Sequence, residues 1–235
     1  MKHREMIARA FGTGILAALA MCSSASSIAA ASAAPTVDNS DIVKAELEKA
    51  ASAAAAAQSG KLLRDPNSPV LGNPNGDVTL VKFTDYQCGY CKASEPRIDK
   101  LLADDPGVRV VVKEFPILGP MSVVAARAAL ASVRQGKYPA YHAALMAHRG
   151  RLTEERIFGI ATSVGLDIAK LKTDMASAEV ADQLIDNFNI ARALKISLTP
   201  GYIVNANVLS GVSAKTSSAK IDFPQEIAAA RAQRK

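Results

Sequence analysis

A pair of cysteines, Cys88 and Cys91, stands between a predicted strand and a predicted helix, and this junction constrains the fold more than any other part of the chain. Residues 78–84 are mostly apolar and rich in residues that favour β-structure, which predicts a buried strand. The apolar spacing of residues 92–103 predicts a helix, and residues 108–113 predict a second buried strand. Strand, helix and strand in this order predict a βαβ unit with two parallel strands.

The rest of the chain predicts further strands around this unit and a helical segment inserted into it. No strand signal occurs between residue 121 and about residue 194. Short helices are predicted there at residues 121–135, 139–148, 153–164, 167–175 and 178–194. An edge strand at 70–71, a hairpin of strands at 201–204 and 207–212, and a last helix at 224–233 complete the order. The predicted fold class is therefore α/β, with an inserted all-helical domain.

The first residues have the pattern of a targeting segment. Three Lys and Arg residues within the first nine positions precede an apolar stretch at residues 10–21. Small residues follow, and Ala31-Ser32-Ala33 fits the pattern cut by signal peptidase, so we predict cleavage near Ala33. The apolar stretch is shorter than the roughly 20 residues that span a bilayer. The sequence predicts a signal peptide at residues 1–33 and export to an oxidising compartment, the bacterial periplasm.

Cleavage would change the cysteine count, which is three in the full chain. Cys22 lies in the predicted signal peptide, so the mature protein would keep only Cys88 and Cys91. A lipoprotein attached through Cys22 is an alternative, disfavoured by the bulky Met21 before it. A disulfide that closes so short a loop stabilises a fold little. We therefore interpret the remaining pair as functional.

Residues 34–64 predict an alanine-rich N-terminal helical stalk, followed by the main domain at 65–235. Helix propensity is high, Asn39 and Ser40 can cap the start, and Gly60 predicts the end. A heptad-like apolar seam is formed by Val43, Leu47, Ala50, Ala54 and Ala57. This seam favours a homo-oligomer formed through residues 38–59. A solvated helical linker is the alternative, because an alanine tract offers a seam in almost any register.

The C-x-x-C motif has three interpretations. A structural zinc site needs four ligands, and the only histidines after the signal peptide, His142 and His148, lie far along the chain and are expected on a helix surface. Haem attachment needs a histidine directly after the second cysteine, where this chain has Lys92. The third interpretation is a redox dithiol, for which a position after a buried strand and at the start of a helix is typical.

This position has consequences for the acidity of the thiols. At a helix N-terminus, free N–H groups and the helix dipole stabilise the thiolate of Cys88, and pKa reductions of about one to five units are typical. A dithiol stabilised in its reduced form is oxidising as a disulfide. We expect Cys91 to lie one turn into the helix, more buried, as the resolving thiol. Gly89 and Tyr90 between them would tune the redox potential.

The segment Phe83-Thr84-Asp85-Tyr86-Gln87-Cys88-Gly89-Tyr90-Cys91-Lys92 resembles the DsbA-like branch of thioredoxin-fold proteins, in particular the periplasmic ScsC and Com1-like group. The resemblance extends to Lys113-Glu114-Phe115-Pro116-Ile117-Leu118-Gly119, to the alanine-rich run at 125–130 and to Thr199-Pro200. It covers most of the mature chain. It implies a thioredoxin fold in residues 65–235 with a helical insertion at about 121–194.

The resemblance also assigns roles to individual residues. Cys88 matches the nucleophile of the family and Cys91 its resolving cysteine. Pro200 matches a cis-proline that faces the dithiol, where the backbone of Thr199 would pair with a substrate peptide. Glu95 matches an acidic residue near the active site. A solvated carboxylate in the first helical turn is the alternative for Glu95.

The chain departs from the family at two places. Relatives often carry a buried acid six residues before the first cysteine, which serves proton transfer to the resolving thiol, but this chain has Lys82. A cation there would favour thiolates, and deprotonation of Cys91 would fall to Glu95 or to water. The loop before Pro200 has a lysine and a leucine where relatives often have glycine, which bears on loop flexibility and substrate range.

These assignments predict a thiol–disulfide oxidoreductase that needs no cofactor and acts on exported proteins bearing disulfides or thiols. Thr199 and the predicted stalk favour a disulfide isomerase or reductase, kept reduced by a DsbD-like membrane partner. A DsbA-type oxidase recharged by a DsbB-like partner is the close alternative.

Two further classes remain open beside the enzyme. Thiolates at Cys88 and Cys91 could hold Cu(I), in line with the copper tolerance associated with the ScsC-like group. A chaperone-like module would bind unfolded chains through the stalk and the helical insertion. A dedicated nucleic-acid binder is excluded, because the net charge of +6 is scattered and only 5% of residues are aromatic.

Overall fold

The computed structural model describes residues 39–205, 207–208 and 221–233. The predicted signal peptide at 1–33 lies outside the described residues, as do residues 209–212 of the predicted hairpin. Asp38–Lys235 forms one compact unit. In the described part of the chain, no helix is both long enough and apolar enough to cross a membrane.

The described residues form a five-stranded mixed sheet with the order β1-β3-β2-β4-β5. Its strands are β1 (Val70–Gly72), β2 (Val78–Thr84), β3 (Val108–Glu114), β4 (Gly201–Val204) and β5 (Asn207–Val208). Strands β2 and β3 pair in parallel, with Thr84 opposite Glu114 at their ends, while β1, β4 and β5 pair antiparallel to their neighbours. Helix α3 (Gly89–Asp104) joins β2 to β3, which confirms the predicted βαβ unit.

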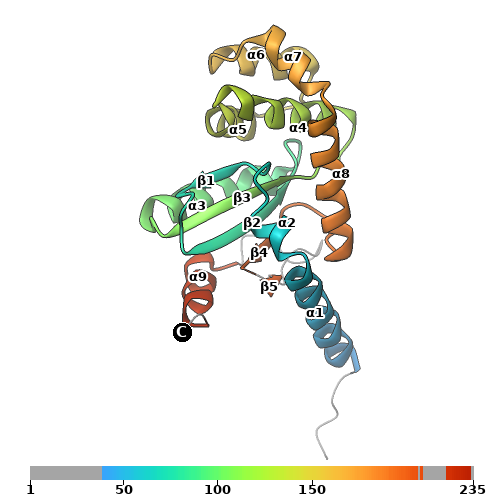
Figure 1. Cartoon of the computed structure of the whole chain (residues 1–235), viewed down its shortest axis with the longest axis vertical. Coiled ribbons are helices and arrows are strands. Elements are labelled where there is room, and N and C mark those ends of the chain that lie inside the picture. The colour runs from blue at the N-terminus through green and yellow to red at the C-terminus, as the bar shows by residue number, and fades with distance from the viewer. Residues whose placement is uncertain (1–38, 206, 209–220, 234–235) are drawn as a thin grey trace, which may run out of the picture. The chain divides into compact units, whose positions relative to one another are not determined.

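The chain between β3 and β4 is helical, as predicted. It contains α4 (Pro120–Ser132), a 3₁₀ turn η1 (Val133–Gln135), α5 (Tyr138–Ala147), α6 (Glu154–Ser163), α7 (Ile168–Met175) and α8 (Ala178–Ala193). In Figure 1, α4 to α7 stack above the sheet and α8 runs back down beside it to rejoin β4. The last helix, α9 (Phe223–Ala232), lies at the other end of the sheet.

Both faces of the sheet are covered, because side chains alternate along each strand. Leu80 and Val110 point into a core that also contains residues of α3, α5 and α9. Val81 and Phe83 point to the other face, where they pack with residues of the N-terminal helices and α8. Burial on both faces explains why the central strands read as continuous apolar runs.

The N-terminal segment forms two helices, α1 (Asn39–Ala57) and α2 (Ser59–Leu63). The predicted end at Gly60 is wrong: α1 ends at Ala57, and Gly60 lies inside the short helix α2, which is held by the complete burial of Leu62. Helix α1 buries Ala51 and Ala55, whereas Val43 and Leu47 of the predicted seam are 58% and 57% exposed. Self-association through this seam stays a prediction.

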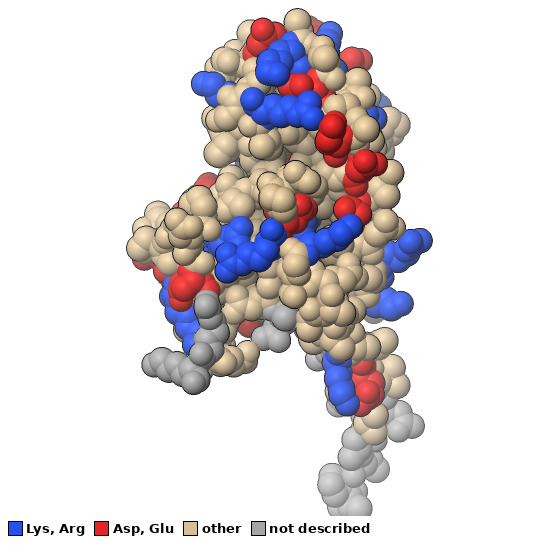
Figure 2. Space-filling model, in the orientation of Figure 1, with Lys and Arg blue, Asp and Glu red and all other residues tan. Residues whose placement is uncertain are grey.

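Basic and acidic side chains are interspersed over the face shown in Figure 2. Many of them pair with opposite charges: Arg134 contacts Asp174 and Glu179, and Lys61 contacts Asp186. Exposed pairs of this kind contribute little to stability. The positive net charge is therefore spread over this face rather than gathered into a single basic patch.

Arg231 ties α9 to two loops at the base of the sheet. Its guanidinium donates to both carboxylate oxygens of Asp77 and to both of Asp105, at distances of 2.6 to 2.9 Å. The side chain is 36% exposed, so we expect Arg231→Ala to lower the free energy of unfolding in urea by about 1 kcal/mol. The control Lys100→Ala breaks the exposed pair with Asp104 and should cost at most about 0.5 kcal/mol. Equal losses would contradict this role of Arg231.

Candidate active site

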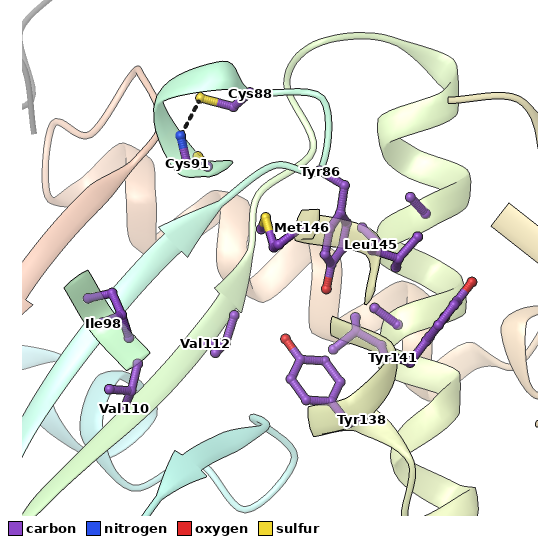
Figure 3. Packing of buried hydrophobic residues seen from close by; sticks show 14 of the residues in the cluster. Tyr86, Cys88, Cys91, Ile98, Val110, Val112, Tyr138, Tyr141, Leu145 and Met146 are labelled. Atoms are coloured by element: carbon purple, nitrogen blue, oxygen red, sulfur yellow. Dashed lines mark hydrogen bonds between the residues drawn. The ribbon is translucent and has the colours of Figure 1, made fainter. Parts of the chain in front are cut away.

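Cys88 is the N-cap residue of α3, directly after the loop that leaves β2. The backbone N–H of Cys91 donates to its Sγ at 3.3 Å, drawn as the dashed line in Figure 3. Both thiols are free, and Cys88 is 5% exposed whereas Cys91 is completely buried. The predicted helix start at residue 92 is wrong by one turn, because α3 begins at Gly89. The expected placement of both cysteines at the start of this helix is confirmed.

The two thiols differ in acidity. The hydrogen bond from the thiol of Cys91, with smaller contributions from Thr199 and from the backbone N–H groups of Tyr90 and Cys91, lowers the pKa of Cys88 to about 6 against the effect of burial. Burial, followed by the interaction with Cys88, raises the pKa of Cys91 far above its ordinary value. At neutral pH, Cys88 is therefore the thiolate and Cys91 keeps its proton.

We expect the reduced protein to titrate one thiolate with a midpoint near pH 6, measured by the ultraviolet absorbance of the thiolate. Cys91→Ala removes the largest stabilising contact and should raise this midpoint. Glu155→Gln is the control, because it changes an exposed carboxyl on α6. An unchanged midpoint in Cys91→Ala would show that Cys91 does not stabilise the thiolate.

The loop before β4 brings Thr199 and Pro200 to the dithiol. The Thr199–Pro200 peptide bond is cis, and the Cys88 thiol lies 3.3 Å from the carbonyl oxygen of Thr199. The loop starts at the end of α8 with Lys195 in the left-handed region, at φ 59°. Lys195 and Ile196 donate back to carbonyls of the last helical turn, an arrangement in which glycine is usual.

Gly89 and Tyr90 lie in the first turn of α3, and both are exposed. Tyr90 is 63% exposed and therefore available to a partner molecule beside Cys88. On neighbouring loops, Leu118 and Leu198 are also exposed. The described surface around the dithiol is thus partly apolar.

Lys82 is completely buried on β2 and forms an ion pair with Glu95, one helical turn after Cys91. The Glu95 side chain is only 13% exposed, so a fully solvated carboxylate is the wrong interpretation. Burial acts against ionisation, but the hydrogen bond to His142 and the charge of Lys82 lower the pKa of Glu95 to about 2. A carboxylate of that acidity is a weak base toward a thiol.

His142 belongs to the same buried cluster. Its side chain is 2% exposed, so the expected place on a helix surface is wrong: this face of α5 packs against α3. Its Nε2 lies 3.4 Å from Lys82 Nζ, and its Nδ1 lies 2.7 Å from the Tyr86 hydroxyl. Burial, followed by the charge of Lys82, lowers the pKa of His142 to about 4. The imidazole is therefore neutral at neutral pH.

Sequence reasoning missed Glu114, the last residue of β3. Tyr86 and Tyr138 each donate a hydrogen bond to its Oε1 at 2.7 Å, and Figure 3 shows their hydroxyls turned toward each other. Burial raises the pKa of Glu114 to about 8, although both tyrosines lower it. The sequence did offer one signal for this residue: an acidic side chain stands at the end of a strand that was predicted to be buried.

Asp85 holds the loops around the site in place. Its carboxylate accepts hydrogen bonds from the backbone of Gln87, Ile117 and Leu118 and from the Ser122 hydroxyl, all at 2.8 to 2.9 Å. These contacts join the loop before Cys88 to the segment after β3. Asp85 therefore fixes where the dithiol sits relative to the helical insertion.

Comparison with known proteins agrees with this geometry. Residues 79–220 match the model of the DSBA-like thioredoxin domain. A thioredoxin-like oxidoreductase from Silicibacter pomeroyi DSS-3 is 41% identical, over 75% of this chain and 98% of that one, with a TM-score of 0.67. The catalytic domain of Proteus mirabilis ScsC is 27% identical, over 77% of this chain and 97% of that one, with a TM-score of 0.65.

A curated relative is much longer than the shared region. The Na(+)/H(+) antiporter NhaA 1 of Salinispora arenicola is 32% identical over 138 residues, which make up 58% of this chain and 21% of that protein. The chain thus spans about a fifth of the length of the curated relatives it matches.

The family match and the sheet order together confirm the expected thioredoxin fold with its inserted helices. The similarity to a solved ScsC domain confirms the resemblance first seen in the segment around Cys88. The chain belongs to the DSBA-like thioredoxin domain family.

Proposed function

We propose that the protein is exported and exchanges disulfides with other exported proteins through Cys88 and Cys91, mainly as an isomerase or reductase. The observation that carries this proposal is the asymmetry of the dithiol. Cys88 has the lowered pKa and lies against the Thr199 carbonyl, while Cys91 is buried behind it. The signal-peptide pattern supports the periplasm as the site of action.

The reaction follows from this asymmetry. The Cys88 thiolate attacks one sulfur of a substrate disulfide, forming a mixed disulfide and releasing the other substrate sulfur as a thiolate. Cys91 then loses its proton and attacks Cys88, which closes the Cys88–Cys91 disulfide and releases the reduced substrate. The substrate gains two electrons and the dithiol loses two. An isomerase instead returns the first substrate thiolate to a different sulfur, and the dithiol stays reduced.

Two features support isomerase or reductase work over oxidation. Thr199 precedes the proline, as in isomerase-like members of the resembled family. Helix α1 exposes Ile42, Val43 and Leu47 on its surface, and burial of this apolar face in a homo-oligomer through residues 38–59 would shield the dithiol from an oxidising partner. A DsbD-like membrane reductant is then the expected partner, whereas an oxidase would use a DsbB-like one.

The redox state in cells separates the two directions. Cells that produce the full-length protein are quenched with acid, which traps the redox state of its thiols. The free thiols are then alkylated and counted by mass spectrometry. We expect mostly reduced Cys88 and Cys91, together with recovery of activity from scrambled ribonuclease. The variant Leu47→Glu should lower the oligomeric state and raise the oxidised fraction, whereas the exposed control Glu155→Gln should change neither. A mostly oxidised wild-type pool would favour the oxidase instead.

Cu(I) binding is the alternative of another class. Two free thiols at the start of one helix offer the soft ligands that Cu(I) prefers. Competition with a Cu(I) chelator tests it on the reduced protein. Retention of one Cu(I) that disappears in Cys88→Ser would support this alternative, and no retention would remove it.

A further inference from the structure

Two buried oxygen atoms near the dithiol make no hydrogen bond within the described residues: Thr84 Oγ1 and Glu114 Oε2. Both side chains are completely buried. The two residues face each other across the parallel strands β2 and β3, so their side chains lie next to each other on one face of the sheet. A buried oxygen without a hydrogen-bond partner destabilises the fold. Two such atoms on paired residues therefore point to a function.

The shared face is the one that Cys91 covers. Leu80 and Thr84 lie an even number of residues apart on β2, so both point to the same side, and Leu80 belongs to the core that contains Cys91. The Thr84 hydroxyl is one of the groups that favour the Cys91 thiolate. Thr84 thus lies between the environment of Cys91 and Glu114, its register neighbour on β3.

The hydrogen bonds of Glu114 leave one carboxyl oxygen, Oε2, without a donor, and this oxygen can carry a proton. Tyr86 and Tyr138 donate to Oε1, which leaves Oε2 free to be protonated. Because the single proton of Tyr86 is used on Glu114, His142 Nδ1 carries a hydrogen and donates it to the Tyr86 oxygen. His142 Nε2 lies 3.4 Å from Nζ of Lys82, whose ammonium also pairs with Glu95.

Several titratable groups surround Glu114, whose own pKa is raised toward neutral pH. The titratable groups that face it are Lys82 of β2, Asp85 and Tyr86 of the following loop, and Tyr138, Tyr141 and His142 of α5. Lys82 is paired with Glu95, and Asp85 accepts several backbone hydrogen bonds. Burial raises the pKa of Glu114 to about 8, close to that of an ordinary thiol.

The far end of this hydrogen-bonded cluster reaches a cavity. A pocket of about 550 Å³ between β1, α3 and α5 is lined by Glu95 and His142 together with Lys92, Asp99 and Arg149. Water in this pocket can exchange protons with the cluster without passing through the dithiol. The cluster therefore connects the buried carboxyl of Glu114 with solvent.

We propose that Glu114, acting through Thr84, accepts the proton of Cys91, in place of the acid that relatives carry where this chain has Lys82. The inference rests on the proposed exchange reaction. In the step concerned, the proton of the Cys91 thiol moves to the Glu114 carboxylate, and the Cys91 thiolate attacks the Cys88 sulfur of the mixed disulfide. The bond from Cys88 to the substrate breaks, and its electron pair leaves on the substrate thiolate. Glu114 is a positioning residue here, because it touches neither reacting sulfur.

The role fits the acidities of the two candidate acids. Proton transfer is efficient when acceptor and donor have similar acidities near the working pH. Glu95 has a pKa of about 2 and is a poor acceptor, whereas Glu114 has a pKa of about 8. The pKa of Cys91 is raised by burial, so the pKa of Glu114 lies nearer to it than that of Glu95 does.

A reaction with two kinetic phases measures the reactivity of Cys88 and of Cys91 separately. Reduced full-length protein is mixed with dithiobis(nitrobenzoate), and release of thionitrobenzoate is followed by stopped flow. The first thionitrobenzoate reports attack by Cys88, and the second reports attack by Cys91 on the mixed disulfide. We expect Glu114→Gln to leave the first phase unchanged and to slow the second by about 10²-fold. The rise of the second phase around pH 8 should also disappear.

Matched variants make the result specific. Thr84→Val should slow the second phase alone, whereas Glu155→Gln, an exposed carboxyl on α6, should change neither phase. A second phase with wild-type rate and pH profile in Glu114→Gln would overturn the proposal, as would equal slowing of both phases. If the first phase is missing in the wild type, the proposed function itself fails.

A measurement on the unchanged protein covers the case in which Glu114→Gln does not fold. Carbon-13 NMR of labelled glutamate carboxyls should show one group that titrates near pH 8 in the reduced wild type. Slowing of the second phase in Thr84→Val together with this titration would support the proposal. If every glutamate titrates in the ordinary range, Glu114 is not the acceptor.

Discussion

Replacing Cys88 with serine is expected to reduce disulfide exchange to the rate of buffer alone, while replacing Cys91 with serine is expected to trap the substrate. Cys88 has the lowered pKa and lies beside the Thr199 carbonyl. Cys91 is buried and keeps its proton, so it cannot replace Cys88 as the attacking thiol. Without Cys91, the mixed disulfide on Cys88 has no neighbouring thiol to resolve it.

The two outcomes are measured with scrambled ribonuclease, whose disulfides the Cys88 thiolate can attack. Cys91→Ser should accumulate a covalent complex on non-reducing gels that a reductant removes, whereas Cys88→Ser should form none. Glu155→Gln, which changes an exposed carboxyl on α6, is the control and should keep exchange. A covalent complex formed by Cys88→Ser, and not by Cys91→Ser, would reverse the order of the two thiols.

Breaking the buried pair of Lys82 and Glu95 is expected to have the largest effect on stability. Lys82→Met leaves the mostly buried Glu95 carboxylate without its cation, and loss of one partner of a buried pair costs about 3–5 kcal/mol. The double variant Lys82→Met/Glu95→Gln removes both charges and should recover most of this loss. Denaturant unfolding at neutral pH measures both variants. A loss of less than about 1 kcal/mol in Lys82→Met, the range of surface pairs, would contradict a buried pair.

The pH dependence of stability checks the same pair. The pKa of Glu95 is lowered from 4.5 to about 2 in the folded protein, so the carboxylate stabilises the fold above pH 4.5. This contribution is lost as the pH falls through the folded value. Glu95→Gln should therefore show a smaller decrease in unfolding free energy between pH 4.5 and pH 2 than the wild type.

Local patterns were sufficient to predict the elements that carry the cysteines. Strands β2 and β4 have the bounds that their apolar runs indicate. Cys88 lies at the N-terminus of α3, as expected. These elements depend on side chains that lie close together in the sequence. The spacing of apolar residues and the secondary-structure propensities therefore predict them directly. The pairing of Cys88 with Thr199 followed from a family resemblance, because the two residues lie far apart in sequence.

The cluster around Glu114 could not be predicted in this way. Its members come from β2, the loop after β2, β3, α3 and α5, and these hydrogen bonds join residues 13 to 60 positions apart. His142 was expected on a helix surface because the pattern of α5 does not say that this helix packs against α3. Gly60 was expected to end a helix because propensity does not register the burial of Leu62 two residues later.

The redox equilibrium with glutathione tests the central claim most directly, that Cys88 and Cys91 form an exchanging dithiol stabilised by the Cys88 thiolate. Wild-type protein is incubated with graded ratios of reduced and oxidised glutathione, and its oxidised fraction is read after alkylation. We predict reversible two-electron exchange at a potential less negative than the roughly −270 mV of thioredoxin, since a stabilised dithiol makes a more readily reduced disulfide. A more negative potential, or no exchange with glutathione, would contradict the claim.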